Sequence, residues 1–511
     1  MLPLIVLSPF LLMPVAVWLG RQRARWAGML ALWPAGLTLY FGFMLQTVAA
    51  SGPMEASLPW AESLGLELSF YADGLSLIFA VVIAGIGSLI VIYGSRYFDG
   101  DSESGRFQAT LFAFMGSMLG VVLANNLFAL FVFWELTGFT SFLLIGFKHG
   151  ENEARASAIQ ALLVTGMGGI ALFAATILIA QASGAGNLSD LLSANIPFSN
   201  YNTYPAIIAL VLLAAFTKSA QAPFHFWLPN AMTAPTPVSA YLHSATMVKA
   251  GVYLIARMTP LAGGTPLWTG LVTTAGAITM VLGAWRAVVE TDLKRVLAYS
   301  TVSALGVLVM LLGVGTEEAV TAAVAYLLAH ACYKGAMFLV AGTIEHEIGT
   351  RDVTALSGLR RSMPVTAVAG ALAACSMVGL PLFLGFIGKE LFYEALLGQG
   401  AGWTSLLLAA AVGANVLMGV AGLIAGVSPF AGPGERVVSA HRVPAALNFS
   451  PLALAVAGLA AGLWPGIIEV PVGLAAGSIL REEPGLHLAL WHGFNPVLAL
   501  SLLTLALAAF L

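Results

Sequence analysis

Residues 204–225 have the sequence YPAIIALVLLAAFTKSAQAPFH, and this segment indicates the class of fold. An apolar run that suits a membrane helix leads up to Lys218, and Pro223 then removes a helical hydrogen bond. In lipid, the carbonyl groups that such a break frees need a polar partner, and a neighbouring lysine can donate to them. The stretch therefore predicts a membrane helix that is broken beside a buried ammonium group.

The composition indicates that lipid solvates most of the chain. Hydrophobic residues make up 59% of the 511 positions, charged residues make up 9%, and the mean hydropathy is +0.92. A soluble protein carries about 25% charged residues to cover its water-facing surface. We therefore predict an all-α polytopic membrane protein. About fifteen transmembrane helices are expected, near 1–20, 28–50, 70–94, 107–124, 126–147, 156–183, 204–228, 236–258, 267–288, 294–314, 318–344, 364–394, 404–428, 450–470 and 486–511.

A second broken helix is predicted around Lys389, which follows Gly379, Pro381 and Gly385. The two breaks fall in the seventh and twelfth predicted spans, five apart. Because five is odd, a second copy of such a unit enters the membrane upside down, as in an inverted repeat. Spans four to eight and nine to thirteen are the predicted copies. We expect N-terminal helices at 1–106, the first repeat at 107–258, the second repeat at 259–428 and C-terminal helices at 429–511.

Basic residues are concentrated in alternate predicted loops, and this gives an orientation. No basic residue precedes the apolar stretch 1–20, so we expect a retained span with its N-terminus outside and no cleaved signal peptide. The positive-inside rule then places fifteen of the 21 basic residues in the cytoplasm. The opposite loops hold Arg257 and Arg481. The fifteen are Arg21, Arg23, Arg25, Arg96, Arg106, Lys148, Arg155, Arg286, Lys294, Arg295, Arg351, Arg360, Arg361, Arg436 and Arg442.

Five charged residues remain inside predicted spans, and together with two histidines they form the candidate site. A charge at the bilayer centre is costly, so such residues face protein or water and mark ion pathways. His330 lies four residues before Lys334, on the same helical face, whereas His243 and Lys249 are six apart and share a face only loosely. Neutral histidine both accepts and donates, which suits proton transfer. The alternative is a set of paired residues that only lock helices together. The candidates are Glu135, Lys218, His243, Lys249, His330, Lys334 and Lys389.

No cofactor site is predicted. Cys332 and Cys375 are isolated, so the sequence offers no cysteine cluster for zinc or iron–sulfur, and no ligand-spaced pair of histidines for haem. This disfavours a membrane-embedded enzyme that binds quinone or haem. We locate no sodium site. Asp73 is expected to start a helix at the outer face, and the cluster around Glu345 is either a proton mouth or a solvated group of charges.

Several motifs resemble the antiporter-like membrane subunits of respiratory complex I and its relatives. The resemblance covers about residues 65–400. Within that superfamily, residues 146–168, the sequence YKGA at 333–336 and the sequence GFIGKE at 385–390 are most similar to the A-type subunit of Mrp multisubunit sodium/proton antiporters. The wider motifs are WELT at 134–137, FHFWLP at 224–229, APTPVSA at 234–240, LHSATMVKAG at 242–251 and DLKRVLAYS at 292–300.

This resemblance implies a role for each candidate residue. Glu135 would be the carboxylate partner of Lys218, the central lysine of a first proton half-channel. Lys249, helped by His243, would bridge to a second half-channel. There His330 and Lys334 would continue the path to a terminal lysine, Lys389. Such a subunit would work beside other membrane subunits of the complex and would carry no redox cofactor or catalytic residue.

Two functions follow from the resemblance and stay open at this point. The first is a proton-translocating subunit of a secondary antiporter, which exchanges protons for sodium or another monovalent cation. The second is a proton-pumping subunit of a complex I-type or membrane hydrogenase complex. No long lateral helix of the complex I type is present, which favours the first. The A-type subunit of Mrp antiporters is usually longer, so we expect either a split gene or a piece of the full subunit.

Overall fold

The computed structural model describes residues 2–22, 24–61, 66–398, 402–432, 442–491 and 493–511. Arg23 and Arg436 of the predicted cytoplasmic set lie outside these residues. The chain forms two compact units. Unit 1 comprises Met1–Val238, Ala245–Val272 and Pro471–Pro484, and unit 2 comprises Ser239–Ser244, Thr273–Val470 and Gly485–Leu511.

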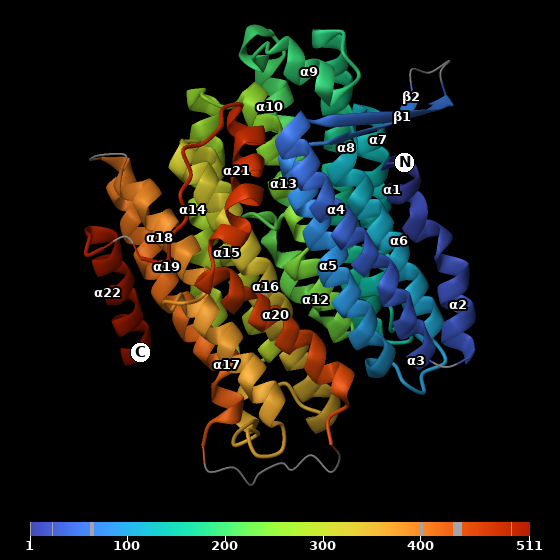
Figure 1. Ribbon diagram of the computed structural model, residues 1–511, viewed down its shortest axis with the longest axis vertical. Coiled ribbons are helices and arrows are strands. Elements are labelled where there is room, and N and C mark those ends of the chain that lie inside the picture. The colour runs from blue at the N-terminus through green and yellow to red at the C-terminus, as the bar shows by residue number, and fades with distance from the viewer. Residues whose placement is uncertain (1, 23, 62–65, 399–401, 433–441, 492) are drawn as a thin grey trace. The chain divides into compact units, whose positions relative to one another are not determined.

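Unit 1 is a bundle of apolar helices with α6 in its core. α6 packs against α2, α5 and α7, and α8 packs against α7 and α10 (Figure 1). Its helices are α1 (Leu2–Leu11), α2 (Met13–Gln22), α3 (Ala24–Ala27), η1 (Gly28–Ala31), α4 (Leu32–Ser51), α5 (Gly74–Tyr97), α6 (Ser104–Leu123), α7 (Leu127–Ile145), α8 (Asn152–Ser183), α9 (Leu188–Ala194), η3 (Phe198–Asn200), α10 (Tyr204–Lys218), η4 (Phe224–Phe226), α11 (Trp227–Asn230), η5 (Ala231–Thr233), η6 (Met247–Lys249) and α13 (Ala250–Ala262).

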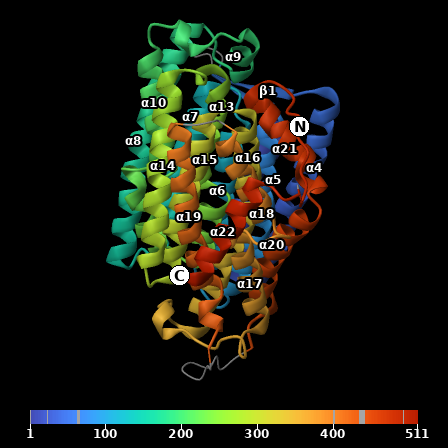
Figure 2. The same ribbon diagram turned by 90° about the vertical axis from the view of Figure 1, so that its left-hand side faces the viewer.

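Unit 2 is built around α15 and α16, which are almost wholly buried. α16 packs against α15, α17, α18 and α20, and Figure 2 shows α15, α16 and α18 from the side. Its helices are α15 (Leu293–Val314), α16 (Glu317–Ile348), η7 (Val353–Ala355), α17 (Pro364–Val378), α18 (Leu384–Leu397), α19 (Trp403–Gly426), η8 (Ser428–Phe430), α20 (Ala445–Leu463) and α22 (Pro496–Phe510). Three helices belong partly to each unit, namely α12 (Thr236–Ser244), α14 (Pro266–Val289) and α21 (Gly466–Leu480).

Local sequence signals set several helix starts. The Asp73 carboxylate accepts a hydrogen bond from the Ser76 amide, and the Ser76 hydroxyl accepts one from the Asp73 amide, which makes a capping box at α5. At the start of α7, the Asn126 side chain accepts from the amides of Phe128 and Ala129 and so caps the helix. Asp73 is therefore the residue that starts a helix, as the sequence predicted.

The predicted class of helical membrane protein is confirmed, with one addition. In the described residues, eleven helices are long and apolar enough to cross a membrane, and shorter apolar helices accompany them. A count of fifteen spans is not established by helix length. The addition is an antiparallel hairpin of β1 (Met54–Ala61) and β2 (Leu66–Ala72), which precedes the third predicted span and reaches into its first residues. In β2, Glu67 is exposed, whereas Ser69 is buried and its hydroxyl accepts from the Asn125 side chain at 3.1 Å.

Three expectations about spans were wrong in detail. The eighth span, 236–258, is interrupted, because α12 ends at Ser244 and α13 begins at Ala250. Near the end of the chain, α20 and α21 replace one predicted span at 450–470, with Pro465 between them. The last helix begins at Pro496 and not near 486. The predicted inverted repeat and its domain boundaries stay predictions.

Candidate functional site

Lys218 is the last residue of α10, and its side chain is almost fully buried in unit 1. Its ammonium donates to the carbonyl oxygen of Trp134 at 3.2 Å and lies 5.2 Å from the centroid of the Trp134 ring. The sequence led us to expect that this lysine contacts the carbonyls of its own broken helix, but it contacts the backbone of α7. Buried donors need acceptors, and a neighbouring helix supplies this one.

Glu135 lies on α7, next in sequence to the carbonyl that Lys218 contacts. The Glu135 carboxylate is within electrostatic reach of the Lys218 ammonium. However, Glu135 and Lys218, both of which the structure describes, form neither a hydrogen bond nor an ion pair within 4 Å. The predicted partners are therefore neighbours whose carboxylate and ammonium are separated.

Glycines on α7 and α8 provide the space around these two charges. A Cβ atom at Gly138 would lie 3.6 Å from the Lys218 Nζ, and one at Gly169 would overlap the Glu135 carboxylate. One at Gly168 would overlap the Thr217 hydroxyl. The two charged side chains consequently occupy room that larger residues would fill.

The break after Lys218 is held by side chains of unit 1. The Ser219 hydroxyl donates to the Val248 carbonyl at 2.6 Å and accepts from the Val252 amide at 3.0 Å. The Trp227 indole donates to the Thr217 carbonyl at 2.9 Å, in the turn that precedes Lys218. These bonds partner backbone groups that a broken helix leaves without internal acceptors or donors, which is the requirement in lipid.

Lys249 lies at a break that the sequence did not reveal. It ends η6 and precedes α13, and its side chain is fully buried. Gly251 lets this helix start approach α10 closely, since a Cβ there would overlap the Ala215 carbonyl. Both lysines are therefore in unit 1. Lys218 ends α10, Lys249 precedes the start of α13, and these two helices pack against each other.

Lys334 and His330 lie on α16 in unit 2, and both are fully buried. The Lys334 ammonium donates to the Ser300 hydroxyl and the Leu297 carbonyl of α15, and it lies 3.8 Å from the Met377 sulfur of α17. None of the described carboxylates forms an ion pair with it. The His330 ring lies 5.4 Å from the Tyr333 ring. The sequence did not single out Ser300, because only the fold brings it to Lys334.

His243 belongs to unit 2, where it is buried at the end of α12. Its ring centroid is 6.0 Å from that of Phe338 on α16, and Lys294 is within electrostatic reach of it. A Cβ atom built at Gly335 of α16 would lie 3.5 Å from the hydroxyl of the next residue, Ser244. The end of α12 therefore lies near the part of α16 that carries Lys334.

Lys389 lies in the first half of α18 and is nearly fully buried. Its ammonium donates to the carbonyl oxygens of Gly379 at 2.9 Å and Val378 at 3.4 Å, where α17 ends. This is the arrangement that the sequence predicted, in which a lysine partners carbonyls freed by a break. Gly388 brings α18 close to α16, since a Cβ there would lie 3.2 Å from the Tyr326 Cα.

Glu390 is a buried carboxylate that the sequence analysis quoted in a motif but did not assign to the site. It follows Lys389, is within electrostatic reach of the Lys389 ammonium, and accepts from the Ser501 hydroxyl of α22 at 2.6 Å. One turn further on, Tyr393 contacts Thr504 at 2.9 Å and accepts from Asn415 at 3.1 Å. Its position next to Lys389 was the sequence signal that could have assigned Glu390 to the site. Its partner Ser501 could not be found in this way, because it is 111 residues away in sequence.

Two residues that we had assigned to loops are buried in ion pairs. Lys294 is 1% exposed and lies 3.8 Å from Glu345, which also contacts Arg351 at 3.4 Å. Arg257 is 2% exposed within α13 and binds the Asp73 carboxylate with both terminal nitrogens, at 2.5 and 2.8 Å. The cluster around Glu345 is thus anchored to a buried lysine, and Arg257 is not a loop residue.

Comparison with known proteins identifies the family. The model described as NADH:quinone oxidoreductase/Mrp antiporter, TM, matches residues 124–417, which is more than half of the chain. The chain belongs to this family. A model of the N-terminus of complex I chain 5 also matches residues 59–108. The family contains both kinds of subunit that the motifs resembled.

Two of the curated relatives are antiporter subunits. The chain is 42% identical over 469 residues to the A/B-type subunit of a probable K(+)/H(+) antiporter of Rhizobium meliloti. It is 38% identical over 535 residues to the A-type subunit of the Na(+)/H(+) antiporter of Alkalihalophilus pseudofirmus. These alignments cover 90% and 97% of this chain but 46% and 66% of the relatives. The chain therefore spans about half to two thirds of the length of these relatives.

Solved structures of the family share the fold. A chain of the Mrp complex from a Dietzia species matches with a TM-score of 0.90 at 37% identity, over 100% of this chain and 55% of that one. A chain of respiratory complex I from Thermus thermophilus matches with a TM-score of 0.81 at 25% identity, over 94% of this chain and 100% of that one. The resemblance to antiporter-like subunits, and to the A-type subunit of Mrp antiporters in particular, is confirmed.

The arrangement provides a chemical basis for proton transfer within each unit. The Lys218, Lys334 and Lys389 ammonium groups donate to carbonyl or hydroxyl oxygens. These acceptors are neutral. A carboxylate in a direct ion pair with the lysine would instead be left as an unpaired charge when the lysine loses its proton. Glu135 and Glu390 lie within reach of one lysine each, so that a small side-chain movement changes the field on that lysine. In the described residues, no cluster of three His, Cys, Asp or Glu side chains could hold a metal ion.

Proposed function

We propose that this chain is a proton-translocating subunit of a multisubunit monovalent cation/proton antiporter, and that it acts as a secondary transporter and not as an enzyme. The observation that carries the proposal is the burial of four lysines, none more than 4% exposed, in a chain whose helices suit a membrane. Burying an ammonium in lipid is costly, and such residues mark ion pathways. The identity to antiporter subunits supports the assignment to this family branch.

The proposed route has two segments. In unit 1 it runs through Glu135, Lys218 and Lys249, and in unit 2 through His243, His330, Lys334 and Lys389. Support comes from the burial of the lysine and histidine side chains of the route, beside which Glu135 is half-buried, and from the helix breaks beside Lys218, Lys249 and Lys389. A break frees backbone carbonyls and makes room for water at membrane depth, and transporters build ion sites in this way.

Partners and cation follow from the relatives. We infer that the chain assembles with other membrane subunits, as in the Mrp complex whose subunit it resembles. The names of the relatives mention sodium in one case and potassium in the other. We propose Na⁺ as the exchanged cation, and an assay that compares Na⁺ with K⁺ distinguishes the two.

The location and orientation complete the proposal. We propose a multi-pass protein of the bacterial inner membrane with its N-terminus outside. Arg96, Arg106 and Lys148 are exposed at helix ends that the proposal assigns to the cytoplasm. Single cysteines at these positions should react with an impermeant reagent only after the cytoplasmic face is opened. Labelling of intact cells at these sites would contradict the orientation.

The test is cation-driven proton movement in everted membrane vesicles that contain the complete complex. Addition of Na⁺ or K⁺ should collapse a pH gradient when the parent chain is present. Lys218→Ala or Glu135→Ala should abolish this response while the complex still assembles, and substitution of Lys389 should do the same. Substitution of Arg360 and Arg361, which are exposed outside the helices, should leave it unchanged. Full activity of the Lys218 variant would refute the proposal.

The second function is a proton-pumping subunit of a complex I-type or hydrogenase complex. The match to a complex I chain along its entire length gives it some support, although the identity of 25% is lower than that to the Mrp chain. Purification of the native complex separates the two functions. Iron–sulfur or flavin subunits would favour the redox complex, and membrane subunits alone would favour the antiporter.

A further inference from the structure

Unit 2 has an open groove where α17 and α20 begin, and no step of the proposed proton route uses it. The groove has a volume of about 760 Å³, which is in the range of small-ligand sites. Its lining comes from residues 362–365 at the start of α17 and from residues 442–452 at the start of α20, two helices that pack against each other. Both helices are in the lower part of Figure 1, drawn in orange shades.

The polar part of the groove suits an anion. Arg442 lines it and is exposed, and Arg360 and Arg361 precede the lining residue Ser362 in the sequence. Asn448 uses its carboxamide oxygen to accept from Thr366 at 2.8 Å, which leaves its amide donors for a ligand. No acidic residue is among the described lining residues. Another cavity of unit 2, of about 50 Å³, contrasts with it, since Glu390 and Glu394 line that one.

The two helix starts add positive potential to the same end. α17 begins at Pro364 and α20 at Ala445, and neither has a side-chain cap or an acidic residue in its first turn. Their first backbone N–H groups therefore lack acceptors from the helix itself, and helix dipoles favour an anion there. By contrast, Asp292 and Asn495 cap α15 and α22 in the same unit.

From the lining residue Phe449, exposed apolar residues continue along α20 beyond the groove. Phe449, Val456 and Leu463 of α20 are 54%, 46% and 37% exposed, and their spacing of seven keeps them near one face. The distance from the first to the last is about 21 Å at 1.5 Å per residue. Half of the hydrocarbon core of a bilayer is about 15 Å thick, so this stripe is long enough for one acyl chain.

We propose that this groove binds one anionic phospholipid, with its phosphate at Arg442 and an acyl chain along the exposed face of α20. Charge complementarity selects an anionic headgroup, and the apolar stripe selects a lipid over free phosphate. Basic pockets between transmembrane helices bind such headgroups in general. The proposal depends only on the chain being a membrane protein, so it stands or falls separately from the proton route.

The test is lipid retention by the purified complex in native mass spectrometry. Delipidated complex is titrated with phosphatidylglycerol, then with phosphatidylcholine, and inorganic phosphate is tested as a competitor. Arg442→Gln should weaken binding of one phosphatidylglycerol about fivefold, since one basic residue near a membrane surface contributes this much. Ala445→Trp should block the same site by filling the groove. Arg295→Gln, which removes an exposed arginine elsewhere in unit 2, is the control and should have no effect.

Each other outcome overturns the proposal. Equal retention of phosphatidylglycerol and phosphatidylcholine would leave only an apolar contact, and displacement by millimolar phosphate would indicate a free-anion site. Loss of another subunit from the Arg442→Gln complex would indicate a protein interface. Unchanged lipid binding in Arg442→Gln would refute the site even if the Ala445→Trp protein failed to fold.

Discussion

The Lys389 ammonium lies 2.9 Å from the carbonyl oxygen of Gly379, so that a side chain of α18 closes the carbonyl end of α17. The same group contacts the Val378 carbonyl. The lysine therefore has two tasks in this structure. It partners backbone acceptors that would otherwise be unsatisfied, and in the proposed function it also carries a proton.

Two substitutions at this position separate these tasks. Lys389→Met removes the donor and leaves the carbonyls without a partner, which costs about 1–3 kcal/mol for each buried group. Lys389→Arg keeps a positive charge and hydrogen-bond donors, but a guanidinium does not release its proton in proteins. We expect the arginine variant to assemble normally and to lose cation-driven proton movement about 100-fold or more.

Thermal stability and proton movement should be measured on the same preparations. A Lys389→Arg complex that is stable and fully active would show that the lysine is only structural. An unstable and inactive Lys389→Met complex would not distinguish the two tasks, and this is why the arginine variant is the decisive one.

The relation between Glu135 and Lys218 leads to a second prediction. Because the carboxylate acts on the ammonium through space and not through a direct bond, its charge and position should both matter. Glu135→Gln keeps the shape and removes the charge, so proton movement should be lost. Glu135→Asp keeps the charge on a shorter side chain and should retain part of it. Equal activity of the two variants would contradict an electrostatic role.

The Gly169 position allows a test that leaves both charges in place. A Cβ at Gly169 would overlap the Glu135 carboxylate, and the side chain would have to move away. Gly169→Ala should therefore lower proton movement, although alanine in a helix interior is favoured over glycine by about 0.5–1 kcal/mol. Gly166 is on the same helix, and a Cβ there would meet no atom within 4 Å.

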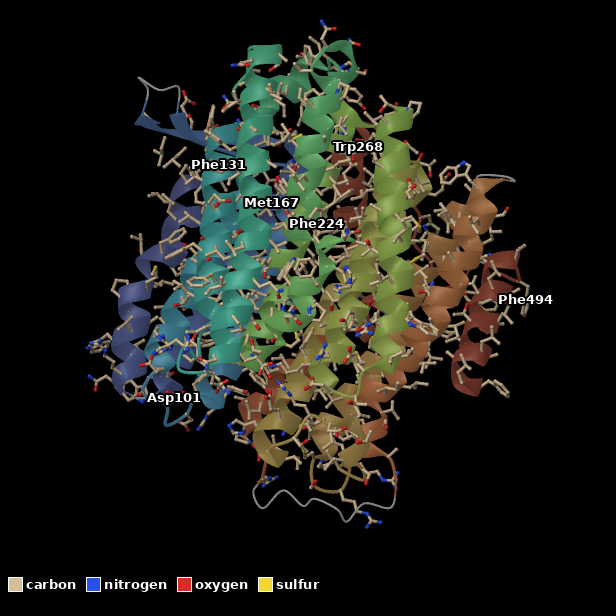
Figure 3. All side chains as sticks on the ribbon, turned by 180° about the vertical axis from the view of Figure 1, so that it is seen from behind. Asp101, Phe131, Met167, Phe224, Trp268 and Phe494 are labelled. Carbon is tan, nitrogen blue, oxygen red and sulfur yellow. The ribbon has the colours of Figure 1, made fainter. Side chains whose placement is uncertain are left out.

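Gly166→Ala is the matched control, since it makes the same chemical change on α8 without reaching Glu135. It should leave activity unchanged. If both variants behave like the parent, the position of the Glu135 carboxylate is not important for transfer. Figure 3 shows this helix from behind, where it carries the labelled Met167 beside the control position.

Much of the fold follows from the sequence because membrane helices depend on local properties. Long apolar runs, Asp73 and Asn126 as helix caps, and the breaks beside Lys218 and Lys389 all have local signals. The interruption before Lys249 lacks such a signal, because residues 244–249 contain neither proline nor glycine. There the chain geometry depends on packing, such as the close approach of Gly251 to α10.

The candidate site was predictable in its residues and less so in its partners. An unexplained charge in an apolar run is visible in a sequence, and so the four lysines were found. Ser300 beside Lys334 and Ser501 beside Glu390 come from distant segments, and a serine in a helix is too common to stand out. Arg257 was misassigned because its partner Asp73 is 184 residues away.

That pair gives the last prediction. Arg257 and Asp73 are both buried, and together they join α13 to the start of α5. Breaking a buried ion pair by removing one partner costs about 3–5 kcal/mol, because the other charge stays behind. Asp73→Asn removes the charge and keeps a good helix cap. It should lower the unfolding temperature of the purified complex markedly. Asp99→Asn, which breaks the exposed pair with Arg96, should cost less than about 1 kcal/mol.

A double variant decides whether the loss comes from the charge. In Asp73→Asn with Arg257→Gln, no charge is left buried, and the two amides can still form a hydrogen bond across the same helices. Much of the lost stability should therefore return, because the cost of leaving one charge buried without its partner is removed. Proton movement per folded complex should stay at the parent level in all three variants, since the pair is outside the proposed route. If the double variant is as unstable as Asp73→Asn alone, the ion pair is not the reason that Asp73 matters.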